Sequence, residues 1–165
     1  MLAKKYKHII PLLLLLMVYT GCEKDEQTGQ QPEEINNNNQ STNIQLEVYG
    51  FNNQKGNLAI AVFNNINSFD SESSAYLDST VHINSTDMSV FLENINPGEY
   101  AISVFHDADE SGDITFGGFL NLIPQEGFGF SNNPNIGMSQ PSYNECKFTI
   151  DNNQTLLIPI NLVYL

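Results

Sequence analysis

The sequence predicts an all-β domain, a single antiparallel β-sandwich of about seven strands. Three observations predict this fold. Short apolar segments alternate with polar residues at a period of two. Turn-forming Asn, Gly, Pro and Asp recur about every 8–12 residues. Residues 44–165 show no helical periodicity.

The first 22 residues resemble a bacterial lipoprotein signal. Three lysines precede an apolar core over 9–18, which is shorter than the roughly 20 residues that a membrane-spanning helix requires. The core leads into YTGC at 19–22, which resembles a lipobox with tyrosine in place of the usual leucine. We therefore expect a signal peptide over 1–21 and lipidation of Cys22. The alternative is a plain secretory signal with an incidental cysteine.

Residues 22–43 are expected to form a disordered tether. The stretch after Cys22 is rich in acids, Asn and Gln and contains one apolar residue, Ile35, which is too little to drive folding. Its start, CEKDE at 22–26, resembles the surface-export signal of Bacteroidetes lipoproteins, in which a lysine and two acids follow the lipidated cysteine. Together these features predict a lipid-anchored, surface-exposed protein of the outer membrane. A merely acidic linker is the alternative for the second motif.

The domain is expected over 44–165, and its strands follow from alternation and apolar runs. Seven segments have this character: 44–49, 58–63, 80–84, 88–92, 100–105, 145–150 and 155–164. The turn residues of 52–56 predict a hairpin between the first two strands, and those of 151–154 predict a closing hairpin between the last two. Pro159 lacks a backbone N–H, which places the last strand at an edge or at a bulge. Such a sandwich resembles immunoglobulin-like or transthyretin-like domains.

The irregular segment 64–79 lies between the second and third predicted strands. It is rich in Asn, Ser and Asp, and we expect Phe69 and Tyr76 to attach it to the core.

The chain is strongly acidic and poor in cysteine. It has 6 basic and 19 acidic residues; removing 1–21 takes away three of the basic residues and no acids, so 3 minus 19 leaves a net charge of −16. Such a charge disfavours nucleic acid as a partner and favours cations. Lipidation would use Cys22, so the domain can form no internal disulfide. Cys146 is expected to be a small buried hydrophobic residue in a strand rather than a nucleophile.

The segment 107–114, DADESGDI, fits the first eight positions of a calcium-binding loop. Oxygen ligands at alternate positions reach one ion only if the chain turns sharply, which Gly112 at the sixth position permits. The expected ligands are three side chains and one backbone carbonyl: those of Asp107, Asp109 and Ser111, and that of Asp113. We expect Ile114 to anchor the loop in the core.

The twelfth position of this loop is Gly118, so the bidentate glutamate of an EF-hand is missing. Glu126 is the nearest candidate for the missing ligand. Crowded carboxylates repel one another without a cation, which favours Ca²⁺, with a dissociation constant on the order of 10⁻⁴–10⁻³ M. The alternative is an Asp/Ser/Gly turn that solvates itself.

Other chemistry has less support in the sequence. We expect His106 to be hydrogen-bonded beneath the loop, because the domain holds one other histidine and a zinc site needs more His or Cys. Glu126 and Glu145 could in principle form a glycosidase pair, but any two acids of an acidic protein could be paired in this way. The alternation of glycine and phenylalanine at 127–130 indicates close packing at the end of the sandwich, or else a stacking surface for a sugar or peptide.

Several segments together resemble the uncharacterised bacterial family DUF2141 over essentially the whole of 44–165. The segments that carry the resemblance are 56–64, 96–107, 109–113, 123–133 and Pro141. The resemblance implies an exported bacterial β-protein without established enzyme activity or catalytic residues. Family members usually have asparagine where Asp109 and Ser111 stand, and both replacements keep an oxygen ligand. The extra residues 117–119 set this loop apart from the usual spacing.

The sequence therefore favours a non-enzymatic surface lipoprotein, expected to be a monomer, whose sandwich binds calcium and presents loops to a glycan or protein partner. One alternative is a structural or adhesion spacer without a ligand. The other is a hydrolase that uses Glu126 and His106.

Overall fold

A computed structural model describes residues 41–118, 120, 122–137 and 139–165, which belong to one compact unit. The predicted signal peptide, Cys22 and nearly all of the predicted tether lie outside the described residues. In the part that is described, no helix has the length and apolar character needed to cross a membrane.

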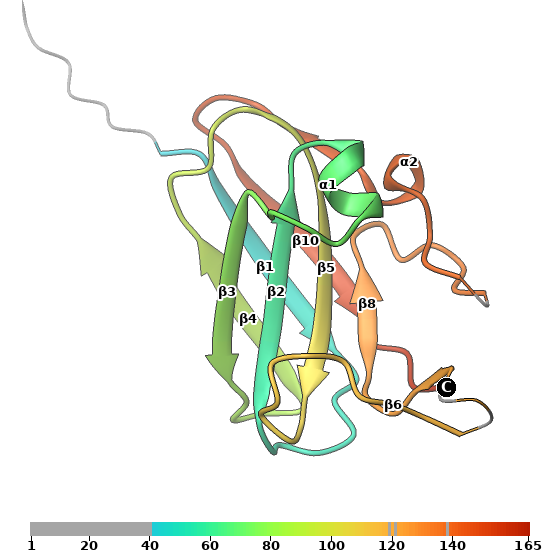
Figure 1. The fold of residues 1–165 in the computed structure, drawn as a ribbon. Coiled ribbons are helices and arrows are strands. Elements are labelled where there is room, and N and C mark those ends of the chain that lie inside the picture. Colours follow the sequence, from blue (N-terminus) through green and yellow to red (C-terminus); the bar gives the residue numbers. More distant parts are fainter. Residues whose placement is uncertain (1–40, 119, 121, 138) are drawn as a thin grey trace, which may run out of the picture. The chain divides into compact units, whose positions relative to one another are not determined.

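The structure is mostly β, which confirms the predicted fold class (Figure 1). The strands are β1 (Asn43–Tyr49), β2 (Asn57–Phe63), β3 (Leu77–His82), β4 (Asp87–Leu92), β5 (Gly98–Asp107), β6 (Phe116–Gly117), β7 (Ile123–Pro124), β8 (Phe128–Phe130), β9 (Phe148–Ile150) and β10 (Thr155–Asn161). One sheet has the order β10-β1-β4 and the larger has the order β3-β2-β5-β8, with β9 also paired to β5. Strands β6 and β7 form a small hairpin of their own. The short strands β6, β7 and β8 were not predicted.

The main core lies between the two sheets. Ile44, Leu46 and Val48 of β1 are fully buried, as their alternation predicts. Other strands of both sheets contribute the rest of this core: Leu58, Ile60, Val62, Tyr100, Ile102, Val104, Ile158 and Ile160 among them. A second cluster, around Phe69 and Phe130, lies with the two short helices. Tyr76 packs against the main core, so both predicted attachment points of 64–79 are confirmed.

The predicted hairpin between the first two strands is wrong. Strand β1 pairs with β4 and β10, whereas β2 pairs with β3 and β5. The loop between them crosses from one sheet to the other. The physical reason is that both strands are apolar along one face, and the two faces bury each other best across the sandwich, where a hairpin would place them side by side.

The predicted closing hairpin is also wrong. Residues 143–146 form the helix α2 (Tyr143–Cys146) instead of the start of a strand. Strand β9 then pairs with β5, and β10 pairs with β1 in the parallel direction. The turn at 151–154 therefore leads the chain from one sheet to the other. The backbone N–H of Asn43, at the start of β1, donates to the Gln154 carbonyl at 2.8 Å and fixes the end of this turn beside β1. Pro159 lies on the edge strand β10, as predicted.

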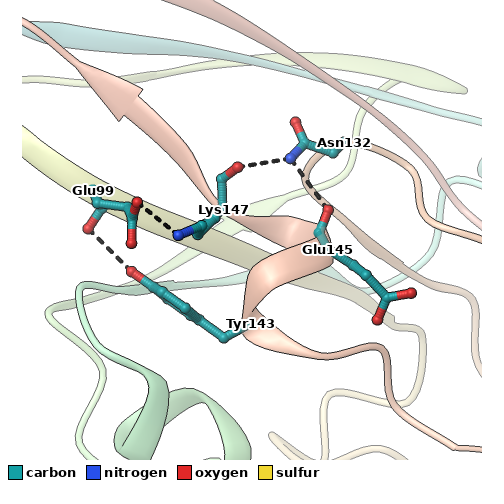
Figure 2. Close-up of polar contacts among 5 residues, drawn as sticks. All are labelled: Glu99, Asn132, Tyr143, Glu145 and Lys147. Carbon is teal, nitrogen blue, oxygen red and sulfur yellow. Dashed lines mark hydrogen bonds and ion pairs between the residues drawn. The ribbon is translucent and has the colours of Figure 1, made fainter.

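Two short helices, α1 (Ile66–Asp70) and α2, lie near one end of the larger sheet (Figure 1). Figure 2 shows how α2 is held to β5: the Lys147 ammonium lies 3.0 Å from the Glu99 carboxylate, and the Tyr143 hydroxyl donates to the Glu99 carbonyl. The Asn132 amide donates to the carbonyls of Glu145 and Lys147. Cys146, the last residue of α2, is buried.

Candidate functional site

The candidate site begins where the central strand β5 ends. Strand β5 is paired to β2 on one side and to β8 and β9 on the other, so its position is fixed along its whole length. Its last two residues, His106 and Asp107, are 1% and 4% exposed. Strand alternation directs His106 toward the interior with Val104, and it leaves Asp107 at the start of the loop.

His106 supports the loop from below. Its Nε2–H donates to the Lys55 carbonyl at 2.8 Å, because a carbonyl can only accept. In the neutral imidazole, Nδ1 then accepts from the Tyr164 hydroxyl at 2.7 Å. Burial raises the pKa of Tyr164, which keeps this hydroxyl protonated. The hydrogen-bonded position predicted for His106 is confirmed, and both ring nitrogens are already engaged.

The Asp107 carboxylate organises the turn that follows. Its two oxygens accept the backbone N–H groups of Ser111 at 2.9 Å and Gly112 at 3.0 Å. Gly112 has a φ of +83°, a conformation that L side chains rarely adopt. The requirement for glycine at this position, predicted from the spacing, is therefore met by the geometry.

Glu126 closes the site from the far side. It stands just before β8, and its carboxylate is 6% exposed. One oxygen accepts the backbone N–H of Ala108 at 2.8 Å, and the other accepts that of Thr115 at 3.1 Å. Thr115 also donates its hydroxyl to the Asp109 carboxylate at 3.2 Å. Thr115 was not singled out from the sequence, since a threonine after an acidic loop carries no distinctive pattern.

Three of the five residues predicted as ligands come together. Carboxylate oxygens of Asp107, Asp109 and Glu126 all lie within 4.8 Å of one another, and among the described residues this is the group able to hold a metal ion. Hydrogen bonds from Ser111 hold the pKa of the exposed Asp109 carboxyl below its usual value, with a smaller contribution from Thr115. An ionised carboxylate has about four lone-pair sites, so these groups can accept backbone N–H groups and still contact a cation.

The other two predicted ligands bond to each other. The Ser111 hydroxyl donates to the Asp113 backbone carbonyl at 2.9 Å. A cation that used both oxygens would replace this hydrogen bond. Ile114 was expected to anchor the loop in the core, and this is wrong: Ile114 is half-buried and belongs to neither core cluster. The bond from Thr115 to Glu126 holds the loop close to β8 and takes over the anchoring role.

Two further residues weighed from the sequence, Glu145 and Cys146, both lie in the helix α2. Glu145 accepts the backbone N–H and the hydroxyl of Ser142 and forms the capping box of α2. Burial, with a smaller effect of Glu145, raises the pKa of the Cys146 thiol to about 12. Cys146 is buried as predicted, although in a helix and not in a strand.

The glycine–phenylalanine segment fills space within the fold. Phe130 is buried against Phe69. A Cβ at Gly127 would collide with the ring of Tyr164, and one at Gly129 would lie 2.6 Å from Ile160 Cγ2. These contacts support the close-packing interpretation for Phe130 and the two glycines, whereas Phe128 is half-buried.

The fold and this loop together define a β-sandwich domain with a carboxylate cluster at the end of its central strand. The chain belongs to the family described as "Uncharacterized protein conserved in bacteria (DUF2141)", whose model matches residues 46–157. This match confirms the resemblance found in the sequence. No curated protein and no solved structure matches the chain.

Proposed function

We propose that this protein is a non-enzymatic, surface-exposed lipoprotein whose sandwich binds one Ca²⁺ ion in the loop after β5 and presents neighbouring loops to a glycan or protein partner. The ion would contact Asp107, Asp109 and Glu126, with Ser111 and the Asp113 carbonyl as further ligands. The lipid on Cys22 would hold the protein in the outer membrane.

The observation that carries the calcium proposal is the convergence of three carboxylates from two separate segments. Glu126 lies 18 positions after Ala108, whose N–H it binds, so the fold itself supplies the ligand that the sequence of the loop lacks. A set of oxygen ligands without nitrogen or sulfur suits Ca²⁺ rather than Zn²⁺. A divalent cation would also offset the mutual repulsion of the three carboxylates.

The non-enzymatic part of the proposal follows from how the candidate catalytic groups are used. His106 has both ring nitrogens in hydrogen bonds within the fold. Glu126 accepts two backbone N–H groups, and Glu145 caps α2. A general acid or base must be able to reach the substrate's proton, whereas His106 is buried between Lys55 and Tyr164, and Glu126 would hold the calcium ion.

Calcium titration of the chain from residue 23 onward tests the calcium proposal. Binding is measured by isothermal titration calorimetry and by the shift in thermal unfolding. Calcium at ten times its dissociation constant is expected to raise the free energy of unfolding by about 1.4 kcal/mol. Magnesium is expected to do less at equal concentration, because it demands a tighter octahedral site.

Two variants report on the ligands. Glu126→Gln and Asp109→Asn are each expected to abolish or strongly weaken the calcium heat. The matched control is Glu93→Gln, which removes an exposed carboxylate elsewhere and is expected to leave calcium binding unchanged. Circular dichroism of the calcium-free variants shows whether they fold. Absence of a calcium heat, together with no thermal shift at millimolar calcium, would contradict the proposal.

The anchoring part is tested separately on intact cells. Protease added outside is expected to digest the domain, and Cys22→Ala is expected to release it from the membrane fraction. Full protection from protease would refute surface exposure.

A further inference from the structure

The outer face of the larger sheet is hollowed between its two edges. The register places Ala59 and Ala61 of β2 beside Phe105 and Ser103 of β5, and these side chains face away from the main core. Three of these four residues are small, so the middle of this face is recessed relative to its edges. Phe128 and Phe130 of β8 lie on one side of it, and Asp78 and Thr80 of β3 lie on the other.

Two segments close this hollow along the strand direction. The connection between α1 and β3 bounds one end with Glu72 and Ser74, and the loop after β5 bounds the other with Gly112 and Asp113. Figure 1 shows that loop folding back across the ends of β2 and β5. This open cavity measures about 560 Å³.

A second cavity of about 670 Å³ continues past β8 toward the β6–β7 hairpin. Phe116, Phe128 and Phe130 line both cavities, so the two lie side by side on this face. The far part is strongly apolar, and its rim is exposed: Phe116 is 51% exposed and Leu122 is 70% exposed. We call the two cavities together the outer-face groove.

The groove changes in polarity from one end to the other. Asp78 and Asp113 line only the cavity at the β3 end, Glu72 lines both cavities, and the rest of the hairpin end is mainly apolar. Among the described residues the lysines are Lys55 and Lys147, and neither lines the groove. The ion pair found in the described part of the chain, Lys147 with Glu99, lies elsewhere.

We propose that the outer-face groove binds an extended peptide segment of a partner protein, with basic side chains at the β3 end and apolar side chains at the hairpin end. Three carboxylates with no lysine among the described residues that line the groove complement a basic ligand and repel an acidic one. A neutral sugar would satisfy the aromatic wall but would leave this charge unmatched. The cavity volumes fall in the range of preformed ligand sites.

This inference rests on the partner-binding part of the proposed function and names the partner's chemistry, but it does not require calcium. Gly112 and Asp113 do belong both to the calcium loop and to the groove wall. Calcium is therefore expected to change peptide affinity only modestly, through the shape of that wall.

Fluorescence anisotropy with defined peptides tests the proposal on the chain from residue 23 onward, which contains both core clusters. The probe is a labelled peptide with arginines at one end and leucine and phenylalanine at the other, made in both orders. The comparison peptide has glutamate in place of arginine. The basic peptide is expected to bind saturably, at least about tenfold more tightly than the acidic one, and more weakly as salt is raised.

Paired variants locate the binding. Asp78→Asn and Glu72→Gln are each expected to weaken binding about threefold, as exposed charge pairs do. Phe116→Ser is expected to weaken it about tenfold through lost apolar contact. The controls lie on β4, on the other sheet: Asp87→Asn removes a comparable charge and Phe91→Ser a comparably exposed ring, and both are expected to have no effect.

Three results would overturn the proposal. The first is failure of the basic peptide to bind in either order, or equal binding of the acidic peptide. The second is a neutral oligosaccharide that shifts the NMR signals of the groove residues while the peptides do not. The third is self-association that Phe116→Ser abolishes, since a second copy would then cover the groove. A Glu126→Gln protein that loses calcium binding but still binds the peptide would support the groove proposal, because peptide binding does not require calcium. Failure of the calcium proposal can therefore be told apart from failure of the groove proposal.

Discussion

At the scale of single residues, Gly129 shows how closely the two sheets approach each other. It lies in β8, opposite Val104 of β5, and faces the inside of the sandwich. A Cβ at this position would lie 2.6 Å from Ile160 Cγ2 and 2.8 Å from the Asn161 carbonyl oxygen. Both atoms belong to β10 of the other sheet, so the absence of a side chain at Gly129 lets β8 and β10 come together.

Gly129→Ala is accordingly expected to lower the free energy of unfolding by about 1–3 kcal/mol, because the added methyl group forces the strands apart. Urea denaturation measures the change. Gly137→Ala is the matched control, since a Cβ there meets nothing within 4 Å and should change stability by less than about 0.5 kcal/mol. Equal effects of the two substitutions would contradict the packing argument.

Cys146 provides a prediction that depends on pH. Burial raises the pKa of its thiol from 9.0 to about 12, so the folded protein holds this proton where the unfolded chain releases it. The stability that this proton contributes is present below pH 9 and is lost as the pH rises toward 12. In a Cys22→Ser background, iodoacetamide at pH 9 is expected to alkylate Cys146 slowly in buffer and quickly in urea. Equal rates in the two conditions would show that the thiol is accessible in the folded state.

At the scale of elements, the short helix α1 places its Phe69 side chain in the second core cluster. Asn65 caps it by accepting the backbone N–H of Ser68 at 2.9 Å. Its Phe69 is fully buried, with ring centroids 5.3 Å from Phe63 and 5.7 Å from Tyr143. A helix of five residues has little stability of its own, so these contacts hold it in place.

Phe69→Ala is therefore expected to destabilise the domain by about 3–5 kcal/mol, as large cavities in cores do. Ile66→Ala in the same helix is the control, because Ile66 is 44% exposed and its truncation should cost less than about 1 kcal/mol. Chemical denaturation followed by tyrosine fluorescence compares the two. A similar loss for both would mean that α1 is needed as a helix rather than for its buried ring.

At the scale of the whole domain, the chain closes on itself through its last strand. Strand β10 pairs with β1 over seven residue pairs, in the parallel direction, and supplies Ile158 and Ile160 to the core. After β10, Phe128 and Val163 exchange two backbone hydrogen bonds. The Tyr164 hydroxyl is hydrogen-bonded to the His106 ring. The end of the chain thus links both sheets to the loop that carries the candidate calcium site.

A chain that ends at residue 154 is expected to lose cooperative unfolding, because it lacks β10 and exposes the edge of β1. Near-ultraviolet circular dichroism during urea denaturation shows the loss. A chain that begins at residue 38 instead of 23 is the control, and it should unfold at the same urea concentration. A sharp transition in the shorter chain would contradict this role of β10.

The amino-acid sequence was sufficient to predict the β class, the buried faces of β1 and β5, an edge or bulge position for Pro159 and the turn at Gly112. Each of these depends on a local pattern: alternation with period two, a missing N–H or a positive φ. The pairing of the strands depends on the folded chain, so both predicted hairpins were wrong, and helix α2 replaced part of a predicted strand. It also decided that Glu126 joins Asp107 and Asp109, and that small residues of β2 and β5 form the outer-face groove. These features arise where segments far apart in the chain become neighbours, and no local period carries that information.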